Sequence, residues 1–401
     1  MEKYGFLGEL VRGGLFFLQN CLLSVNFTFW ITTEKTTLNT FFCIYKALIM
    51  SKIGCSIKVV DLFCGIGGLT HGLRKAGLDV VAGYDIDSTC KYAYEANNKS
   101  KFFNQDVSNI EGSKLSEQYN GADLKVLVGC APCQPFSTYS FKTKDKNKWR
   151  LLMQFSRIIN EVQPNIISME NVPRLAKFTK EPVLQEFLKN LTNNGYKYSW
   201  EIVNCADYGI PQYRKRLVLL ASKFGDISLI PKTHTPQNYI TVEDAISKLE
   251  PLKSGETSKK DTLHKASKLS DLNLKRIKQS KPGGTWKDWD EELWLDCHKK
   301  ASGSTYVSVY GRMKWGVPAP TMTTHCIGIG NGRFGHPEQD RAITLREAAI
   351  LQSFPKEYKF VKGNSDFNKR TMSIHIGNAV PVRLGEVIGE SIKLHLRKYH
   401  S

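Results

Sequence analysis

A single cysteine lies between two prolines in the segment 131–138, which reads APCQPFST. Each proline holds its own φ near about −65° and lacks an N–H donor, and the residue before each proline is pushed toward extended geometry. An apolar strand is predicted immediately upstream, at 125–129. The segment therefore presents one thiol stiffly at the carboxyl end of a strand, where open α/β sheets hold their sites. Cys133 is the candidate nucleophile.

Two other interpretations compete for this cysteine. Cys130 and Cys133 form a C-x-x-C pair, which can be a redox pair or half of a zinc site. A zinc ribbon needs a second pair at similar spacing, and none of the other eight cysteines supplies one. The redox interpretation fits better but leaves the downstream motifs unexplained. On these residues alone the nucleophilic, redox and structural interpretations stay open.

A glycine-rich turn at 61–69 (DLFCGIGGL) follows a predicted strand and opens a predicted helix. Its glycines let backbone approach a ligand, and the helix start offers N–H groups to an anion. Thr70 stands where a dinucleotide fingerprint has its third glycine, so a smaller nucleoside with a carboxylate, such as S-adenosylmethionine, fits better. Asp85, twenty residues after Gly65, can bind ribose hydroxyls, and Asp106 can accept from an adenine amino group.

An acidic residue and an alternating basic segment follow farther along. Glu170, in the segment MENV, ends another predicted strand on the rim that carries Cys133. The segment 212–216 reads QYRKR, and an extended chain would send three of its side chains to one face: Gln212, Arg214 and Arg216. Arginine forks suit base carbonyls and phosphates.

These residues need a scaffold, and from residue 57 short apolar strands alternate with helical stretches, the pattern of a doubly wound parallel sheet. Strands are predicted at 57–63, 79–85, 125–129, 165–170, 200–205 and 216–222. Helices are predicted at 68–76, 88–97, 149–162 and 182–194. The alternation stops after residue 222, and the lysine-rich region 223–340 indicates a second, smaller domain with irregular and β content. A turn followed by a helix is predicted at 373–396.

The charge balance indicates a polyanionic partner. The chain has 401 residues, with 56 Lys and Arg against 38 acids and a net charge of +18. Such an excess favours nucleic acid, because neutralising phosphates releases counterions. Hydrophobic content of 41% and charged content of 23% are ordinary for a soluble globular protein. The ten cysteines form no disulfide framework, so we expect a reducing cytoplasm.

The first fifty residues differ from the rest, with ten aromatic and only seven charged residues. They contain no run of about 18 uninterrupted apolar residues, as a membrane span would require. Met50 stands just before the first predicted strand. We expect translation to begin naturally at Met50.

Taken together, these segments resemble the cytosine-C5 DNA methyltransferases from about residue 57 to residue 396. The matching motifs, in family order, are the cofactor turn at 61–69, the Pro-Cys segment at 131–137, Glu-Asn-Val at 170–172, Gln-x-Arg-x-Arg at 212–216, the segment 341–355 and Gly-Asn-Ala-Val-Pro at 377–381.

The resemblance implies an α/β fold, a doubly wound and mostly parallel sheet of the Rossmann-like S-adenosylmethionine-dependent type, with a second, smaller irregular/β target-recognition domain. The implied bounds are an N-terminal extension at 1–55, a catalytic domain at 56–222 completed by 372–398, a target-recognition domain at 223–340 and a connecting motif at 341–371.

The implied reaction is methyl transfer from S-adenosylmethionine to C5 of a cytosine flipped out of a specific DNA sequence. Cys133 would add to C6, Glu170 would bridge N3 and the exocyclic amine, and Arg214 with Arg216 would hold O2 and the neighbouring backbone. No metal is expected.

By the same resemblance, the cofactor would contact Phe63, Ile66, Gly68, Asp85, Asp106, Val107, Pro132, Asn378 and Val380. The predicted DNA contacts are Gln134, Ser137, Arg150, Gln212, Arg312, Thr323 and Arg333. Solvation of an ordinary surface is the competing explanation for the contacts predicted in the recognition domain.

The expected partner is double-stranded DNA, and the expected setting is a DNA-associated monomer in a bacterial cytoplasm, with no membrane attachment. The expected role is the protective methylase of a restriction–modification system, paired with a cognate restriction endonuclease. Three alternatives remain: the same chemistry on tRNA, a catalytically silent DNA-binding relative, and a thiol oxidoreductase in which Cys130 would matter as much as Cys133.

Overall fold

The computed structural model describes residues 55–132, 150–177, 182–301, 303, 305–363 and 368–399. The predicted N-terminal extension at 1–55, apart from Cys55, and the predicted start at Met50 lie outside these residues. Among the described residues no helix is both long and apolar enough to cross a bilayer.

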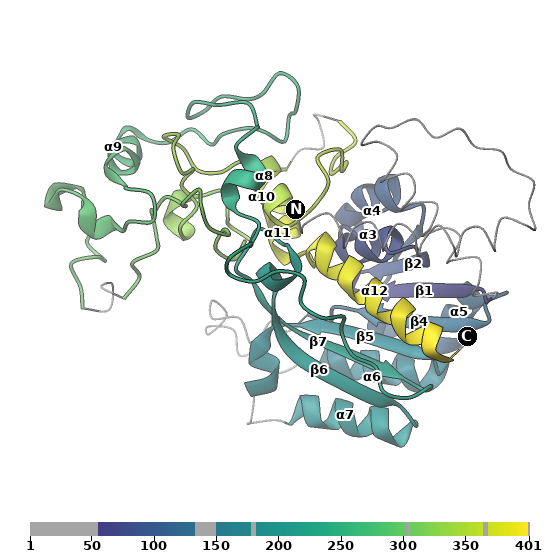
Figure 1. The fold of residues 1–401 in the computed structure, drawn as a ribbon. Helices are drawn as coiled ribbons and strands as arrows, with labels where there is room; N and C mark the ends of the chain where they lie inside the picture. The colour runs from purple at the N-terminus through teal and green to yellow at the C-terminus, as the bar shows by residue number, and fades with distance from the viewer. Residues whose placement is uncertain are drawn as a thin grey trace, which may run out of the picture. The chain divides into compact units, whose positions relative to one another are not determined.

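A seven-stranded sheet, in the order β3-β2-β1-β4-β5-β7-β6, forms the centre of the fold (Figure 1). Its strands are β1 (Ile57–Leu62), β2 (Asp79–Asp85), β3 (Lys101–Asn104), β4 (Leu124–Gly129), β5 (Ile166–Asn171), β6 (Lys197–Asn204) and β7 (Lys215–Ser222). The first five strands in that order run parallel, β7 is antiparallel to β5, and β6 is antiparallel to β7. The doubly wound, mostly parallel sheet is thus confirmed.

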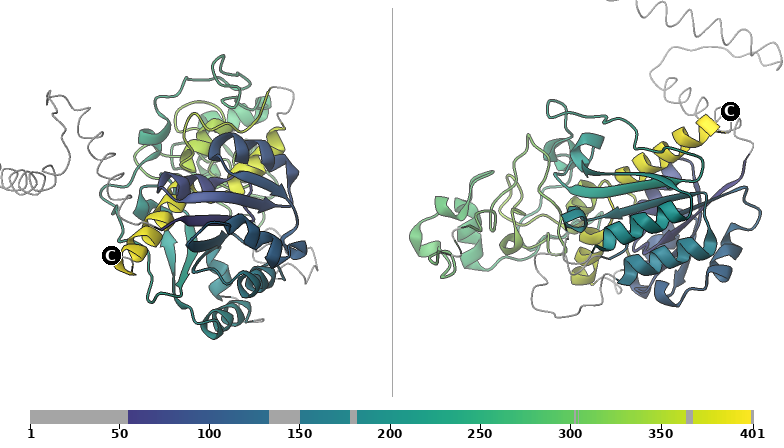
Figure 2. Two further views of the ribbon diagram at one scale, coloured as in Figure 1. Left: turned by 90° about the vertical axis from the view of Figure 1, so that its right-hand side faces the viewer. Right: turned by 90° about the horizontal axis from the view of Figure 1, so that it is seen from below.

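Helices cover both faces of this sheet, as the right-hand view of Figure 2 makes clear. The helices between the strands are α3 (Gly68–Lys75), α4 (Lys91–Asn98), α5 (Gly112–Ser116), α6 (Arg150–Val162) and α7 (Val183–Asn193). Strand β1 explains the two layers, because Val59 packs in a cluster with α3 while Val60 packs in one with α6 and α7. Alternate side chains of a strand point to opposite faces. The predicted strands and helices are confirmed, with ends displaced by up to three residues.

The chain returns to the sheet at its C-terminus through α10 (Leu345–Leu351), α11 (Lys369–Asn378) and α12 (Val382–Tyr399). Helix α12, yellow in Figure 1, packs along α3. A Cβ atom added at Gly72 would come within 2.1 Å of the Val382 carbonyl oxygen, so the two helices touch through their backbones. The Lys393 ammonium donates to the Ala76 carbonyl at 2.8 Å. A helix from the C-terminal end of the chain therefore covers the sheet together with α3.

The region 223–340 is largely irregular. Its helices are α8 (Val242–Ile246) and α9 (Asp271–Gln279), with short 3₁₀ turns, and its β pairing consists of isolated bridges among the described residues. A small cluster of Trp286, Trp289 and Leu293 supplies a local core. The domain bounds predicted from the sequence remain a prediction.

Candidate active site

A cavity of about 490 Å³ opens at the carboxyl edge of the sheet. Its walls come from the turn after β1, the end of β2, the segment after β4, the end of β5, the entry to β7 and the end of α11. Strand β7 can contribute because it is antiparallel to β5, which brings its first residues to the edge where β5 ends. The size suits a nucleoside-sized ligand.

The glycine turn brings backbone close to the cavity. Gly67 precedes α3 with φ at 85°, a conformation that favours glycine. A Cβ atom at Gly68 would lie 2.3 Å from the Val380 carbonyl oxygen, so the C-terminal segment rests directly on this glycine. Phe63, with φ at 59°, is a non-glycine residue in the left-handed region, a strain that clusters at ligand sites. Phe63, Ile66 and Gly68 line the cavity, and Gly67 lies between two of them in the chain.

Asp85 closes the end of β2 and is held by two backbone N–H groups. One carboxylate oxygen accepts from Gly65 N at 2.8 Å and the other from Asp87 N at 2.9 Å. Burial raises the pKa of Asp85. Each carboxylate oxygen can accept a second hydrogen bond, so the group is oriented toward the cavity with capacity for two hydroxyls.

Asp61 is a second acid in the same wall, and the sequence analysis assigned it no role of its own. It is buried, and its Oδ2 accepts from the Thr70 hydroxyl at 2.7 Å. Its Oδ1 is buried without a hydrogen-bond partner among the described residues. Burial raises the pKa of Asp61 to about 7. This carboxyl is therefore poised between its neutral and charged forms near neutral pH.

Asp106 and Val107 do not line the cavity as the structure places them. Asp106 begins a 3₁₀ turn, and its side chain accepts from Ser108 N at 2.8 Å. Val107 is buried in the hydrophobic core. Their proposed contact with an adenine ring stays a prediction, whereas Pro132, Asn378 and Val380 do line the cavity.

Glu170 is another buried acid in the cavity wall, only 2% exposed. Its Oε1 lies 2.8 Å from Arg216 Nε, and its Oε2 accepts from the Cys130 thiol at 2.7 Å. Pro132 lines the same cavity and directly precedes Cys133 in the chain. Cys133 itself, with Gln134 and Ser137, lies outside the described residues. Arg150 begins α6 and is exposed.

Arg214 is fully buried and bonded to backbone. Its Nη1 donates to the Met322 carbonyl at 2.9 Å, and its Nη2 donates to the Gly377 and Ala379 carbonyls at 3.1 and 3.3 Å. Burial lowers the pKa of Arg214 to about 9. The guanidinium lines the cavity, but its bonds tie the recognition region to the C-terminal segment.

The structure contradicts the predicted DNA contact of Gln212. The side chain is fully buried, donating to the Leu351 carbonyl and to Gln352 Oε1 and accepting from Met322 N. The alternation in this segment is real, but it turns Gln212 inward, because the chain there pairs with Ala319.

The structure also contradicts the predicted DNA contact of Arg312. Its side chain is 4% exposed and donates to the carbonyls of Ile277, Ser280, His336 and Gln339, and it also pairs with Asp340. A guanidinium so engaged holds the region together and cannot reach a base edge.

The other two recognition residues differ in accessibility. Arg333 is half-buried and donates to the Gly284 carbonyl, and burial lowers its pKa. Thr323 is exposed. Their roles stay predictions.

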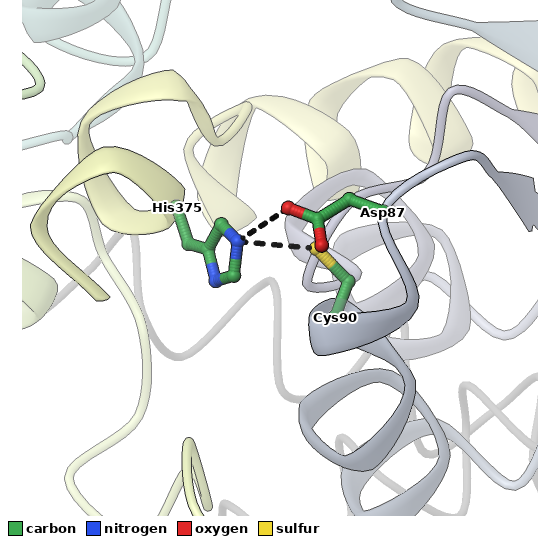
Figure 3. Close-up of side chains that lie close together, drawn as sticks. All are labelled: Asp87, Cys90 and His375. Atoms are coloured by element: carbon green, nitrogen blue, oxygen red, sulfur yellow. Dashed lines mark hydrogen bonds and ion pairs between the residues drawn. The ribbon is translucent and has the colours of Figure 1, made fainter. Parts of the chain in front are cut away.

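The cavity also contains residues that the sequence analysis missed, among them Asp61, Asp87, Cys90 and His375. Asp61 and Asp87 could have been found by their place at the ends of predicted strands. No local pattern indicated His375, which reaches Asp87 and Cys90 across the fold (Figure 3).

A cavity at the carboxyl edge of a doubly wound sheet, with Pro132 and a buried Glu–Arg pair in its wall, is typical of the ligand site of an α/β enzyme. The family model for C-5 cytosine-specific DNA methylase matches residues 57–394. The chain therefore belongs to the C-5 cytosine-specific DNA methylase family and is a DNA cytosine-5 methyltransferase.

Among curated relatives, the Type II methylase M.HgiDII of Herpetosiphon aurantiacus is 55% identical over 85% of this chain and 96% of its own length. The Type II methyltransferase M1.HphI of Haemophilus parahaemolyticus is 31% identical over 88% of this chain and 91% of its own.

Solved structures agree with this fold. The methyltransferase EhMeth of Entamoeba histolytica superimposes with a TM-score of 0.59 at 17% identity, covering 85% of this chain and 99% of that one. The Dnmt2 methyltransferase of S. pombe superimposes with a TM-score of 0.57 at 19% identity, covering 86% and 99%.

Proposed function

We propose that this enzyme methylates C5 of a flipped cytosine in a specific DNA sequence, by way of a transient bond between Cys133 Sγ and C6. One observation carries the proposal. The buried pair of Glu170 and Arg216 lies in the wall of the same cavity as Pro132, the residue before Cys133. An acid held by a guanidinium, next to a nucleophile, is what addition to a pyrimidine requires.

The chemistry explains the residue types. C5 of cytosine is a poor nucleophile, and a thiolate that adds to C6 breaks the aromatic ring and moves electron density onto C5. Cys133 must therefore lose its proton first, because the thiolate is the reactive form. After C5 has gained the methyl group, the C5 proton leaves to water and the sulfur–C6 bond breaks, which restores the ring and the thiolate.

Glu170 would offset the charge that builds on the ring during addition. Its carboxyl would donate a proton toward N3 and accept from the exocyclic amine, which is electrostatic stabilisation of the developing charge. Arg216 keeps the carboxyl in place through the 2.8 Å contact. Cys130, bonded to the other oxygen, would give way to the base.

The cavity residues fit S-adenosylmethionine, which supplies an electrophilic methyl group when bound. Asp85 is oriented by two N–H groups and would accept from the ribose hydroxyls. Phe63, the Ile66 and Gly68 backbone, Asn378 and Val380 would enclose the rest. Asp61 Oδ1, which no described residue contacts through a hydrogen bond, would gain from a cationic ligand, because a nearby positive charge stabilises the charged carboxylate.

Double-stranded DNA is the proposed substrate. C5 and C6 are inaccessible inside a duplex, so the base must be flipped into the cavity. The net charge of +18 favours phosphate contacts, and region 223–340 would read the sequence. We further propose that the enzyme protects DNA from a cognate endonuclease, since two of its relatives are named Type II enzymes. We also propose that it acts as a monomer in the cytoplasm.

Two linked experiments test the proposal. Bisulfite sequencing of plasmid DNA from cells expressing the enzyme should reveal one methylated sequence. A duplex carrying 5-fluorocytosine at that position should then form a covalent complex in the presence of S-adenosylmethionine, because fluorine cannot leave as a proton does.

The two cysteines of the C-x-x-C pair provide the matched comparison. Cys133→Ser should form no complex, while Cys130→Ser should still form it, because a serine hydroxyl can also donate to Glu170. Trapping that survives Cys133→Ser, or plasmid DNA without 5-methylcytosine, would rule the mechanism out. Equal dependence on both thiols would mean that Cys133 alone does not account for the addition to C6.

A further inference from the structure

His375 of α11 reaches across to the turn that follows β2 (Figure 3). Its Nε2 lies 2.9 Å from Asp87 Oδ2, 3.2 Å from the Thr89 hydroxyl and 3.6 Å from the Cys90 sulfur. His375 is 7% exposed, and with Asp87 and Cys90 it lines the cavity. Two segments from opposite ends of the described chain thus meet at the cofactor side of the site.

Asp87 in turn contacts the residue proposed to bind ribose. Its backbone N–H donates to Asp85 Oδ1 at 2.9 Å, while Gly65 N holds Asp85 Oδ2 at 2.8 Å. In the Asp87 side chain, Oδ2 contacts His375 and Oδ1 accepts from Thr89 N at 3.0 Å. A continuous series of hydrogen bonds therefore runs from His375 through Asp87 to Asp85 and the glycine turn.

Charge supports the same connection. Burial alone would raise the pKa of Asp87, but hydrogen bonds from Thr89 and His375 outweigh that effect and hold the pKa below its usual value. The Asp87 carboxylate is thus charged and fixed, and a bond from His375 to a charged group is among the stronger kinds.

The three side chains also have the composition of a metal site, since their ligand atoms all lie within 4.8 Å of one another. Two features argue for a hydrogen-bonded group instead. Burial, with the nearby Asp85 and Asp87, raises the pKa of the Cys90 thiol, so this sulfur stays protonated. His375 Nδ1 has no partner among the described residues, whereas metal-binding histidines almost always donate from their second nitrogen.

We propose that His375 is a positioning residue for the cofactor: by holding Asp87, it orients the Asp85 carboxylate and joins α11 to the ribose end of the cavity. The inference rests on the proposed function, in which Asp85 binds the ribose of S-adenosylmethionine. It adds that the C-terminal helix contributes to cofactor affinity through a side chain that touches no reacting atom.

The test measures equilibrium binding of S-adenosylmethionine and steady-state methylation with purified full-length variants. His375→Ala should weaken cofactor binding about tenfold, the loss expected for one hydrogen bond to a charged group. The KM for S-adenosylmethionine should rise by a similar factor, while kcat at saturating cofactor stays within about twofold, because an interaction with bound substrate alone changes KM. His375→Gln, whose amide can donate to Asp87, should restore affinity to within about threefold of the wild type.

A second arm tests whether Asp87 transmits the effect. Asp87→Asn should weaken cofactor binding, and adding His375→Ala to it should cost little more, because residues in one network are not additive. Independent, additive losses would contradict the proposed connection.

His395→Ala is the matched control, since His395 is also a buried histidine of the C-terminal helices, bonded to Ser222 Oγ at 2.7 Å and absent from the cavity wall. It should lower the melting temperature without changing the KM for the cofactor. Equal KM effects for His375→Ala and His395→Ala, or an unchanged KM in His375→Ala, would overturn the inference. Failure of the wild type to bind S-adenosylmethionine would instead refute the proposed function.

Discussion

Arg216 Nε lies 2.8 Å from Glu170 Oε1, although the two residues belong to different strands. The contact exists because β7 runs antiparallel to β5, so that Val218 pairs with Glu170 and the start of β7 meets the end of β5. A wholly parallel sheet would place the start of β7 at the opposite edge. The departure from parallel order is therefore what assembles the proposed catalytic pair.

Replacing Glu170 by glutamine tests that pair. Glutamine keeps the shape but cannot share a proton with the ring, so kcat should fall at least about a hundredfold, as for loss of a general acid. Methyl transfer from labelled cofactor would measure it, with DNA binding retained. Glu161→Gln, at an exposed pair with Arg157, is the control and should leave activity near normal. Comparable rates for both variants would remove Glu170 from the mechanism.

A methyl group at Gly68 should separate the glycine turn from the C-terminal segment. Its Cβ would lie 2.3 Å from the Val380 carbonyl oxygen, so backbone must shift, and overpacking of this kind costs roughly 1–3 kcal/mol. We expect Gly68→Ala to lower the free energy of unfolding and to weaken cofactor binding. Gly316→Ala, where no atom lies within 4 Å, should change neither. Unchanged unfolding of Gly68→Ala would show that the segment packs elsewhere.

Asp61 should make stability depend on pH. Its pKa is raised to about 7 in the folded protein, so the folded state binds more protons than the unfolded state between about pH 4 and pH 7. Stability from this group is complete below the unfolded pKa and is lost as the pH rises through about 7. Asp61→Asn keeps an acceptor for Thr70 and removes the titration.

Urea unfolding at several pH values would check this. The stability of Asp61→Asn relative to the wild type should rise between pH 4 and pH 7, by up to a few kcal/mol, and level off above that range. Parallel curves for the two proteins would mean that Asp61 stays charged in the folded state, for example through an ion that pairs with it.

Arg312→Ala should damage the fold and leave base recognition alone. The change strips several buried carbonyls of their donor, which should lower the free energy of unfolding by about 3 kcal/mol or more. Bisulfite sequencing of cells that express the variant should find any residual methylation at the wild-type sequence. Relaxed sequence preference in a fully stable variant would restore Arg312 as a reader of DNA.

Thr323→Ala is the complementary change. Thr323 is exposed, so its loss should alter the free energy of unfolding by less than about 0.5 kcal/mol. If Thr323 reaches a base edge, the variant should methylate related sequences more readily, measured on a set of duplexes with single mismatches. An unaltered preference would leave Thr323 as ordinary surface.

The sequence by itself determined six of the seven strands, the helices α3, α4, α6 and α7, the glycine turn and the acids at strand ends. It did not indicate β3 or α5. The role of Cys133 stays a prediction. These features depend on short-range rules: apolar periodicity sets each element, and prolines and glycines set the turns. The place of Glu170 followed from the sequence, because the carboxyl ends of parallel strands meet at one edge of the sheet. The place of Arg216 did not, because this residue begins a strand and reaches that edge only through the antiparallel run of β7.

Only the tertiary structure decided which polar side chains turn inward. Gln212 and Arg312 look like surface readers in the sequence, yet both are buried and bonded to backbone from distant segments. The contact of His375 with Asp87 likewise joins residues 288 positions apart. Such contacts arise when the C-terminal helices return to the sheet, and a buried polar group must then find a partner wherever the fold supplies one. No local pattern encodes that choice, because burial is a property of the assembled chain.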